Sequence, residues 1–396
     1  MTLPTIAQSP TEPKFVQNPY AFYERARALG RIVYWEDYGL PAVVSAAAVN
    51  AILRDRRFGR EIPPEKRRPI PAHQAPFYAV EAHSMLELEP PRHTRLRALV
   101  LRAFTSRRIA AMGPEIAALS HRLIDGFPSE PFDLLPAFAR LIPVIVIARL
   151  LGVPESMADQ LLNWSNAMVG MYQARRSRAM EEAAATAATE FADFLRSYVE
   201  ERRARPADDL ITHLIAAEAE GDKLSTDELI ATCILLLNAG HEATVHSLGN
   251  AVKVLLQEKT PPEALAPAAI EATVEELLRF DPPLHLFTRH AYEDVEVMGQ
   301  TFAKGSEVAL LLAAANRDPA AFERPAKFLP GRAAKPNLSF GAGLHFCVGA
   351  PLARLELQTA LPILFARQPG LALAGRPRYA DLYHFHGLER LQVKLR

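Results

Sequence analysis

Apolar positions recur at helical spacing over most of the chain, whereas strand-like runs are few and short. The helical repeat predicts helices over residues 20–29, 46–54, 92–103 and 107–127, and long helical segments between 157 and 203. Strand-like runs occur at residues 31–35, 42–45, 295–297 and 307–312. This balance predicts a mainly α fold with small β-sheets, formed by residues 1–396 as a single domain whose first 19 residues are irregular.

One predicted helix is much longer than the others. Ser225-Thr-Asp-Glu228 has the pattern of a capping box, in which Ser225 and Glu228 each accept a hydrogen bond from the other's backbone N–H. Helical sequence then continues to about Glu258, where Pro261 and Pro262 forbid further helix. About 33 residues at 1.5 Å each would span roughly 50 Å, enough to cross the whole domain.

Residues 63–83 contrast with these periodic segments, because they are rich in proline and carry Lys66, Arg67 and Arg68. We expect a long loop here, and loops of this length are usually either functional or disordered. A run of charges most often forms solvated surface. The alternative is an entrance loop that attracts an anionic substrate.

Composition and charge exclude several classes of protein. Hydrophobic residues make up 49% of the chain, enough to bury a large core. The 45 basic residues balance 45 acidic ones, which gives no reason to expect nucleic acid as a partner. The two cysteines, Cys233 and Cys347, argue against a disulfide framework. Because the N-terminal residues show no secretory signal and the longest apolar run, 141–153, is too short to cross a bilayer, we expect a soluble cytoplasmic protein.

The most specific pattern in the sequence is Phe340-Gly-Ala-Gly-Leu-His-Phe-Cys-Val-Gly349. Two glycines before Cys347 allow a positive φ and a close approach of the backbone to a partner. A helix-compatible stretch, 350–367, follows at once. Its backbone N–H groups and its dipole would point toward the sulfur and favour the thiolate form. His345, two residues earlier, can also donate to an anion.

A thiolate held in this way is suited to bind a metal. The absence of a nearby second cysteine or histidine pair argues against zinc. A single thiolate fits haem, whose porphyrin supplies the equatorial nitrogens. The alternative is a tight glycine turn around an inert, buried cysteine. With about six of ten positions matching, chance agreement over the chain is below about 10⁻⁵ at average residue frequencies, which disfavours that alternative.

The cysteine loop resembles the haem-ligand motif of the cytochrome P450 superfamily, and the resemblance extends over roughly residues 20–396. Further segments resemble the family in the same order: Pro90-Pro-Arg-His-Thr-Arg-Leu-Arg97, Ala239-Gly-His-Glu-Ala-Thr244, Glu276-Leu-Leu-Arg279 and Ala315-Asn-Arg-Asp-Pro319. The resemblance implies the cytochrome P450 fold, with haem b between the long distal helix and the helix after the cysteine loop, and with Cys347 as the axial ligand of the iron. The short N-terminal segment is similar to that of bacterial members rather than membrane-anchored ones.

Several further residues gain a role through this resemblance. His93 and Arg97, spaced i, i+4, share a helix face and can both donate to a carboxylate, although a plain surface pair has the same spacing. The resemblance implies that they bind the haem propionates together with Arg289 and His345, a task that suits the planar donors of arginine. It also places the haem against Phe340, Gly341, Gly349, Ala239 and Gly240.

Glu276 and Arg279 are spaced i, i+3 and would normally be read as a weak surface pair. In the resembling family this pair is buried and holds the scaffold behind the cysteine loop, usually with a further arginine. The matching place here is Lys327, which lacks the fork of arginine, so the third member of the network is uncertain. We assign these residues a structural role.

The distal helix departs from the family pattern. Family members usually carry an acid followed directly by threonine, whereas here the acid Glu242 is followed by Ala243, and Thr244 lies about 100° further around the helix. We expect all three positions to bear on catalysis. A hydroxyl of the substrate or an ordered water replaces the missing alcohol, or a distorted helix brings Thr244 or His241 into the proton relay, or the reaction is not ordinary hydroxylation.

By resemblance, a substrate pocket is formed from five separated segments of the chain. Its candidate residues suggest an apolar, partly aromatic cavity, and each has an ordinary structural role as its alternative. The candidates are Phe77, Tyr78, Met85, Met168, Met171, Tyr172, Asn238, His285, Phe287, His384, Phe385 and His386.

The resemblance implies a monooxygenase that inserts one oxygen atom from O₂ into a small hydrophobic substrate. Electrons would come from a separate ferredoxin and its reductase, since the chain shows no flavin or iron–sulfur motif. We expect a monomer whose ferredoxin docks near Arg102, Arg107, Arg108 and Arg354. Two alternatives remain at this point: a peroxide-using or oxidative-coupling enzyme, and a haem-thiolate protein that senses a ligand without turnover.

Overall fold

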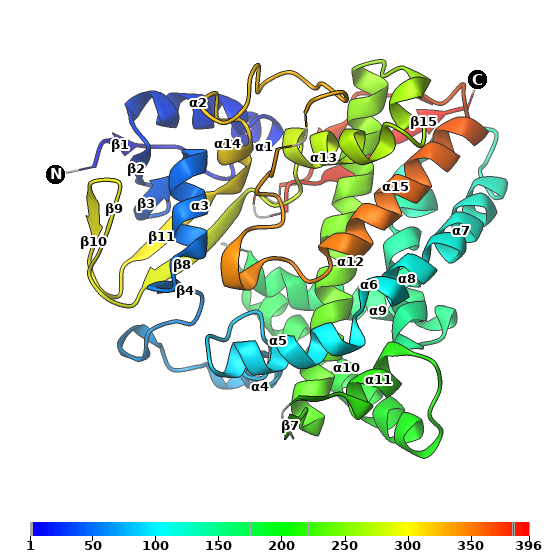
Figure 1. Cartoon of the computed structure of the whole chain (residues 1–396), viewed down its shortest axis with the longest axis horizontal. Helices are drawn as coiled ribbons and strands as arrows, with labels where there is room; N and C mark the ends of the chain where they lie inside the picture. Colours follow the sequence, from blue (N-terminus) through cyan, green and yellow to red (C-terminus); the bar gives the residue numbers. More distant parts are fainter. Residues whose placement is uncertain are drawn as a thin grey trace.

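The computed structural model describes residues 3–173, 176–219, 222–333, 335–381, 383 and 385–395. A β-sheet region that holds the N-terminus lies on one side of the molecule, and a larger helical region lies on the other (Figure 1). The predicted balance of long helices and small sheets is confirmed. Within the described residues no helix is both long and apolar enough to cross a membrane.

The largest sheet has six strands in the order β1-β2-β3-β11-β8-β4. Two of its pairings, β1 with β2 and β3 with β11, are parallel, and the others are antiparallel. The strands are β1 (Thr5–Ile6), β2 (Ile32–Trp35), β3 (Leu40–Val43), β4 (Phe58–Gly59), β8 (Leu286–Ala291) and β11 (Glu307–Leu311). Strand β8 was not predicted, because its arginine and histidine break the apolar run that marks the other strands.

The remaining strands form two- and three-stranded sheets. They are β5 (Phe132–Asp133), β6 (Glu218–Ala219), β7 (Asp222–Lys223), β9 (Val295–Val297), β10 (Gln300–Phe302), β12 (Ala372–Leu373), β13 (Arg378–Tyr379), β14 (Leu388–Arg390) and β15 (Gln392–Lys394). The predicted strand at 42–45 begins two residues earlier, at Leu40.

The helices cover both faces of the sheet region and make up most of the rest. The α-helices are α1 (Pro13–Gln17), α2 (Tyr20–Leu29), α3 (Ala46–Arg54), α4 (Ala75–Glu81), α5 (Arg92–Ala103), α6 (Ser106–Ala111), α7 (Gly113–Asp125), α8 (Leu141–Leu151), α9 (Ala158–Val169), α10 (Arg178–Ala204), α11 (Leu210–Ala216), α12 (Thr226–Gln257), α13 (Ile270–Phe280), α14 (Leu312–Asn316) and α15 (Ala350–Arg367). The predicted ranges of α2, α3 and α5 match the structure residue for residue.

Two predictions, one of a helix and one of a loop, were wrong at prolines. The predicted helix 107–127 is two helices, because Gly113-Pro114 starts a new one. The predicted loop 63–83 contains α4, in which Pro76 stands in the first turn. Proline is tolerated in the first turn of a helix, since the N–H that it lacks would have no partner there. Pro114 and Pro76 each stand in the first turn of a helix, so Pro76 was not the loop signal that the prediction assumed.

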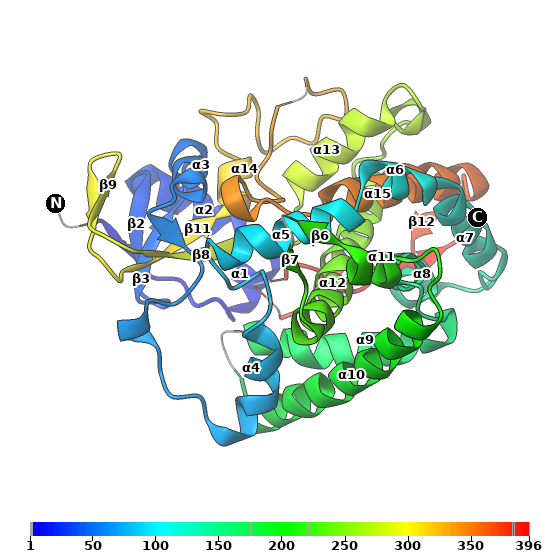
Figure 2. The ribbon, with the colours of Figure 1, turned by 60° about the horizontal axis from the view of Figure 1, so that its bottom comes forward.

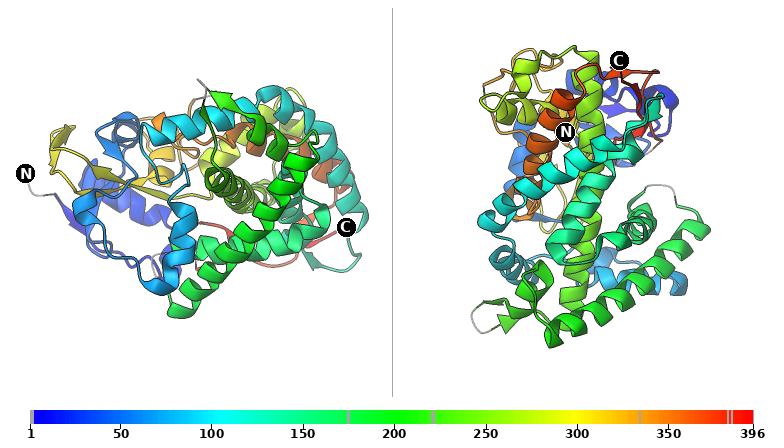
Figure 3. Two further views of the ribbon diagram at one scale, coloured as in Figure 1. Left: turned by 90° about the horizontal axis from the view of Figure 1, so that it is seen from below. Right: turned by 90° about the vertical axis from the view of Figure 1, so that its right-hand side faces the viewer.

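Helix α12 passes through the helical region from one end to the other (Figure 3). It has 32 residues, and the predicted capping box between Ser225 and Glu228 is confirmed. Most of its side chains are buried, and it packs against α8, α10, α13 and α15. An element buried on nearly every side is a rigid wall on which a site can be built.

A buried ion-pair network joins α13 to the segment before the cysteine loop. Both guanidinium nitrogens Nε and Nη2 of Arg279 donate to Glu276, at 2.7 and 2.8 Å, and both side chains are almost completely buried. The third member is Arg332, whose Nε donates to Glu276 at 2.9 Å. The expected third position, Lys327, contributes only its backbone carbonyl, which accepts from Arg279 and Arg332. The arginine that completes the network lies five residues further along the chain than the expected position. The expectation for Lys327 is therefore corrected.

Replacement of Arg332 by Ala should lower the free energy of unfolding by about 1–3 kcal/mol, because a buried carboxylate oxygen of Glu276 then loses its donor. Lys327→Ala keeps the backbone carbonyl and should change stability by less than about 0.5 kcal/mol. Urea denaturation of the two variants measures the difference. Equal losses from both substitutions would contradict the assignment of Arg332 as the third member.

Candidate active site

The cysteine loop takes its shape from two glycines in the left-handed region. Gly341 and Gly343 both have φ of +69°, as the sequence predicts for a tight approach. A Cβ on Gly343 would lie 2.2 Å from the backbone oxygen of Leu53 at the end of α3. The loop therefore presses directly on the α3 backbone. The backbone N–H of Cys347 then donates to the Phe340 carbonyl at 3.1 Å, which closes the loop.

Cys347 stands three residues before α15, and its side chain is exposed although protein surrounds it, because it opens onto an internal cavity. Burial raises the pKa of the Cys347 thiol. The N–H groups of Gly349 and Ala350 and the charge of Arg97 act in the opposite direction without outweighing burial. The predicted contribution of the backbone N–H groups is therefore present, but burial exceeds it. A bound metal ion deprotonates a coordinating thiol outright.

The cavity has a volume of about 2800 Å³. Ligand pockets are commonly about 300–1,000 Å³, so this one has room for a large cofactor together with a substrate. The cysteine loop forms one wall, and the middle of α12 forms another. Ala239 is exposed in an otherwise buried stretch of α12, so this helix also presents bare surface to the cavity.

The side chains expected to bind propionates gather along the cavity. The rings of His93 and His345 lie 4.4 Å apart, and Arg97 and Arg289 line the same space. Burial, with the charges of His345 and Arg97, lowers the pKa of His93 to about 4. Burial and the nearby Arg60 lower the pKa of Arg289 to about 9. Each shift records a cationic form whose burial the nearby acids do not offset.

Two further residues, Glu89 and Arg60, lie beside these side chains and were missed from the sequence. Glu89 accepts from His345 at 2.9 Å and from the backbone N–H of Arg60 at 2.7 Å. Arg60 ion-pairs with Glu87 at 2.5 Å. Arg60 directly follows β4, and only the pairing of β4 with β8 places it beside Arg289. No local pattern signals that contact.

Buried polar side chains with few hydrogen-bond partners around the cavity indicate whether haem fits. Arg289 is 2% exposed, and the one hydrogen bond described for its side chain goes to the Thr288 carbonyl, at 2.7 Å. His93 Nδ1 is buried without a partner among the described residues. Arg97 donates to the Phe346 carbonyl at 2.7 Å, beside Cys347. Buried cations require anionic partners. A planar group with a thiolate on its iron and two carboxylates at its edge therefore fits the residues present.

The acid of the distal helix lies between two histidines. Glu242 approaches Nε2 of His241 at 3.4 Å and Nε2 of His246 at 3.3 Å. Burial alone would raise the pKa of Glu242, but the two imidazoles outweigh it and hold that pKa well below its usual range. Nδ1 of His241 donates to the Leu237 carbonyl at 2.8 Å, because a carbonyl can only accept. His246 was not predicted, although its i, i+4 spacing from Glu242 was a readable signal.

Thr244 does not face the cavity as a free hydroxyl. Its Oγ1 donates to the Gly240 carbonyl, one turn back, at 3.2 Å. The helix around it is regular, so no distortion turns Thr244 toward the position that Ala243 occupies. The alcohol that the resembling family carries after its acid has no substitute from this chain at Thr244.

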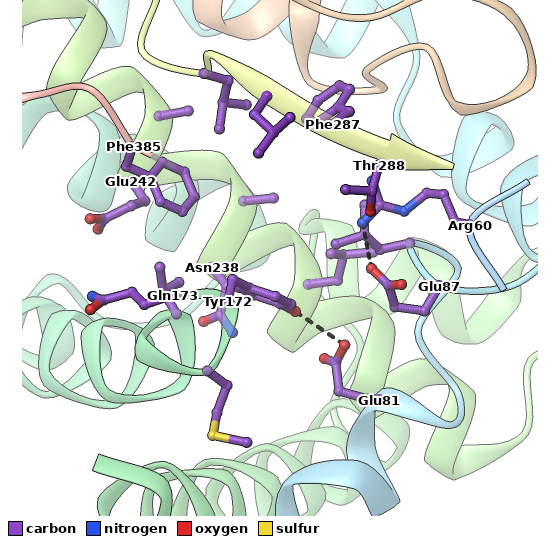
Figure 4. Close-up of a pocket in the computed structure, with 18 of the residues that line it drawn as sticks. Arg60, Glu81, Glu87, Tyr172, Gln173, Asn238, Glu242, Phe287, Thr288 and Phe385 are labelled. Atoms are coloured by element: carbon purple, nitrogen blue, oxygen red, sulfur yellow. Dashed lines mark hydrogen bonds and ion pairs between the residues drawn. The ribbon is translucent and has the colours of Figure 1, made fainter. Parts of the chain in front are cut away.

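Most of the predicted substrate residues line the cavity, and Figure 4 shows part of this wall. Those on the cavity wall are Phe77, Tyr78, Met85, Met171, Tyr172, Asn238, Phe287 and Phe385.

Three predicted pocket positions lie elsewhere. Met168 is fully buried behind the wall, where its sulfur accepts from the Asn238 amide at 3.7 Å. His285 is fully buried with Tyr23, whose hydroxyl lies 2.7 Å from its Nδ1, and His386 packs against it with ring centres 4.4 Å apart. Met168 lies on α9, whereas His285 and His386 lie in irregular segments just before β8 and β14, and all three pack into the core. His384 lies outside the described residues.

Comparison with known proteins gives a consistent family assignment. The family model described as Cytochrome P450 matches residues 17–265 and 269–367. The biotin biosynthesis cytochrome P450 of Bacillus subtilis (strain 168) is 36% identical over 98% of this chain and 99% of the relative. The vitamin D(3) 25-hydroxylase of Pseudonocardia autotrophica is 38% identical over 96% and 94%.

Solved structures agree with these sequence relatives. The crystal structure of P450BioI in complex with hexadec-9Z-enoic acid ligated acyl carrier protein has a TM-score of 0.91, with 35% identity over 97% of this chain and all of that chain. The bacillaene polyketide synthase cytochrome P450 PksS of Bacillus subtilis 168 has a TM-score of 0.89, with 34% identity over 98% and 99%. The cofactor of the site is accordingly haem b with an axial cysteine thiolate, and the ligand is Cys347.

Gly343→Ala should reduce the haem bound per chain at least about tenfold, because a backbone oxygen at 2.2 Å cannot yield to a Cβ. Gly341→Ala is the matched control, with the same φ but only the Phe287 ring, a movable side chain, at 3.3 Å. Both variants carry about 1–2 kcal/mol of left-handed strain. Haem content after purification measures the difference. Equal loss from both would show that strain, rather than the contact with α3, governs the loop.

Proposed function

Because the chain belongs to the cytochrome P450 family, we propose that it inserts one oxygen atom from O₂ into a small, largely hydrophobic organic substrate, with electrons from a separate ferredoxin and its reductase. The family membership itself makes the chain a cytochrome P450 monooxygenase, an oxidoreductase. The observation that carries the proposal is the Cys347 thiol, which opens onto a cavity whose opposite wall is the bare surface of α12 at Ala239.

When bound, haem b supplies the iron at which O₂ is activated, and the thiolate pushes electron density that favours O–O cleavage. The chain holds this group through Cys347 and through the donors of His93, Arg97 and Arg289. His345 orients His93 while it is itself held by Glu89.

We assign proton delivery to Glu242 together with His246 and His241. The three side chains form a contact chain within 3.4 Å on the cavity side of α12, and all three line the cavity. The Leu237 carbonyl keeps a hydrogen on Nδ1 of His241, so Nε2 can donate to Glu242 only when the ring is protonated. The cluster therefore suits the storage of one exchangeable proton. Water, or a hydroxyl of the substrate, carries it past Ala243 into the cavity.

The apolar part of the cavity supports a hydrophobic substrate. Phe77, Phe287 and Phe385 line it, and Phe77 and Tyr78 pack edge to face. The relatives named above include a vitamin D(3) hydroxylase and an enzyme crystallised with an acyl chain, both with long apolar substrates. A cavity of this size accommodates a molecule of that class.

The ferredoxin would dock on the cysteine side of the molecule. Arg102 and Arg107 are exposed, and Arg108 is paired at 3.5 Å with an exposed aspartate, Asp208. Arg354 is less available, because Glu275 neutralises it through two hydrogen bonds. The docking patch is therefore assigned to the α5–α6 side, where Arg102, Arg107 and Arg108 lie.

Turnover supported by a ferredoxin, its reductase and NAD(P)H should incorporate one atom of ¹⁸O from ¹⁸O₂ into the product. Mass spectrometry of the product from a hydrophobic substrate library makes this measurement. Hydrogen peroxide without ferredoxin is the comparison, because the absence of a threonine at position 243 leaves a peroxide-using enzyme as the second candidate. Efficient product formation with peroxide alone and none with ferredoxin would replace the proposal by that second candidate.

Glu242→Gln should lower the turnover number by about 10²-fold or more, the usual contribution of a positioned proton carrier. His246→Gln keeps the helix and should produce a smaller loss together with a larger ratio of rates in H₂O and D₂O, since proton delivery then limits turnover. Steady-state kinetics in both solvents, with product formed per electron consumed, measure these effects.

Two variants serve as controls for the proton route. Ala243→Thr should raise the product formed per electron on non-native substrates, because it restores a hydroxyl beside the acid. Thr244→Val removes a hydroxyl that bonds to Gly240 and should leave that ratio unchanged. A strong loss of coupling from Thr244→Val, without one from His246→Gln, would shift the relay to Thr244.

A further inference from the structure

Another acid on the cavity wall lies away from Glu242 (Figure 4). Glu81 is the last residue of α4, and its carboxylate accepts from the Tyr172 hydroxyl at 3.1 Å. In Figure 4 these two side chains stand on the same side as Asn238, while Phe287 and Phe385 lie on the other side of the space. Helix α4 stands beside α10 at the edge of the helical region (Figure 2).

The surroundings of Glu81 stabilise a charge on its carboxylate only in part. Burial, with repulsion from Glu87, raises the pKa of Glu81 to about 7, and Tyr172 and Arg60 only partly offset this. The Arg60 guanidinium is already bound to Glu87 at 2.5 Å. A carboxylate at the C-terminal end of a helix is also disfavoured by the helix dipole. Glu81 is therefore not placed for stability.

A second acceptor lies under the cavity wall nearby: the side chain of Asn238 lines the cavity, while its Oδ1 is itself covered. Asn238 is 8% exposed, lines the cavity, and its Oδ1 has no hydrogen-bond partner among the described residues. Its amide nitrogen is turned toward the sulfur of Met168, a weak acceptor, at 3.7 Å. A buried carbonyl oxygen without a donor costs free energy. A carboxylate and an amide carbonyl together favour a ligand that carries N–H donors and a positive charge.

We propose that Glu81, Asn238 and Tyr172 form a subsite, here called the acceptor pocket, for a protonated amine on the substrate. The inference rests on the proposed function, because the ligand is the molecule that is oxidised. The ammonium group donates to the Glu81 carboxylate, and to Asn238 Oδ1 once that amide turns toward the cavity. The Tyr172 hydroxyl continues to donate to Glu81. The apolar body of the substrate lies along Phe287 and Phe385, toward the space between Ala239 and Cys347. Oxidation then falls on carbon remote from the amine.

The entrance of the cavity has the opposite charge. Lys66, Arg67 and Arg68 are exposed and line it, although Arg67 is paired with Glu61 at 2.6 Å. These side chains are solvated, and solvated charges contribute little to affinity. An anionic substrate held there would leave the enclosed acceptors Glu81 and Asn238 without partners. The interior therefore favours the amine over the acid.

The affinity for an amine should depend on pH with a defined sign. The groups acting on Glu81 are Glu87 and Arg60, which are paired, and Tyr172; α12 contributes the neutral Asn238. From α10, Glu181 is held by His73 at 2.7 Å. A bound ammonium favours the carboxylate, so binding strengthens as pH rises through about 7 and weakens below it. The Glu81→Gln variant should lose this dependence.

The test is calorimetric titration of the haem-bound enzyme with three probes of equal chain length: dodecylamine, dodecanol and dodecanoate. We expect dodecylamine to bind about 10- to 100-fold more tightly than dodecanol at pH 8, as for a hydrogen bond to a charged group. Glu81→Gln should abolish this preference, and Tyr172→Phe should reduce it. Glu61→Gln removes an acid at the entrance and should leave the preference intact.

The optical spectrum of the haem reports the orientation of the probe. Dodecylamine bound with its ammonium at Glu81 should not show the change produced by nitrogen on iron, because its nitrogen is at the far end of the cavity. Tighter binding of dodecanoate, an unchanged preference in Glu81→Gln, or nitrogen on iron in the wild-type protein would each overturn the proposal. Because these titrations need no turnover, they separate the acceptor pocket from the monooxygenase reaction itself.

Discussion

The whole structure depends on keeping the Cys347 thiol uncovered on the wall of a cavity that the protein does not fill. A buried sulfur prefers to stay protonated, and burial indeed raises the pKa of Cys347. The fold opposes this with the N–H groups at the start of α15 and with the charge of Arg97. The cysteine loop is held in place by Gly343, which packs against the α3 backbone, and by the Glu276 network behind the loop. The scaffold thus supplies geometry, and the metal supplies the remaining free energy for a thiolate.

The same open space explains the unpaired charges along its edge. Arg289 and His93 are buried with pKa values below their usual ranges, which is unfavourable in a protein without its cofactor. Two carboxylates at the edge of haem b reverse that penalty, so the binding free energy of the cofactor includes the relief of these desolvated donors. Glu89 only partly offsets the same penalty at His345, because burial lowers the pKa of that imidazole too. Folding and cofactor binding are therefore coupled through charge as well as through the iron.

The sequence predicted those features that depend on residues close together in the chain. The capping box at Ser225, the two left-handed glycines and the three exact helix ranges follow from local rules. The features that failed depend on residues brought together by the fold. Arg332 reaches Glu276 through an irregular segment, and Arg60 meets Arg289 through strand pairing. Met168 and His285 were misplaced because the direction of a side chain on a buried element is set by packing.

Two of the acids that line the cavity, Glu242 and Glu81, have surroundings that push their pKa values apart, and this separation assigns them different tasks. Two imidazoles hold Glu242 ionised despite its burial, so at neutral pH it is an anion that attracts and positions a proton-bearing histidine or water. Glu81 has no cation to itself, and burial raises its pKa to about 7, so it is ready to gain a positive partner. Opposite shifts in one enclosed space are the usual way in which a protein gives similar groups distinct roles. The acid on α12 therefore serves the reaction, and the acid on α4 serves the choice of substrate.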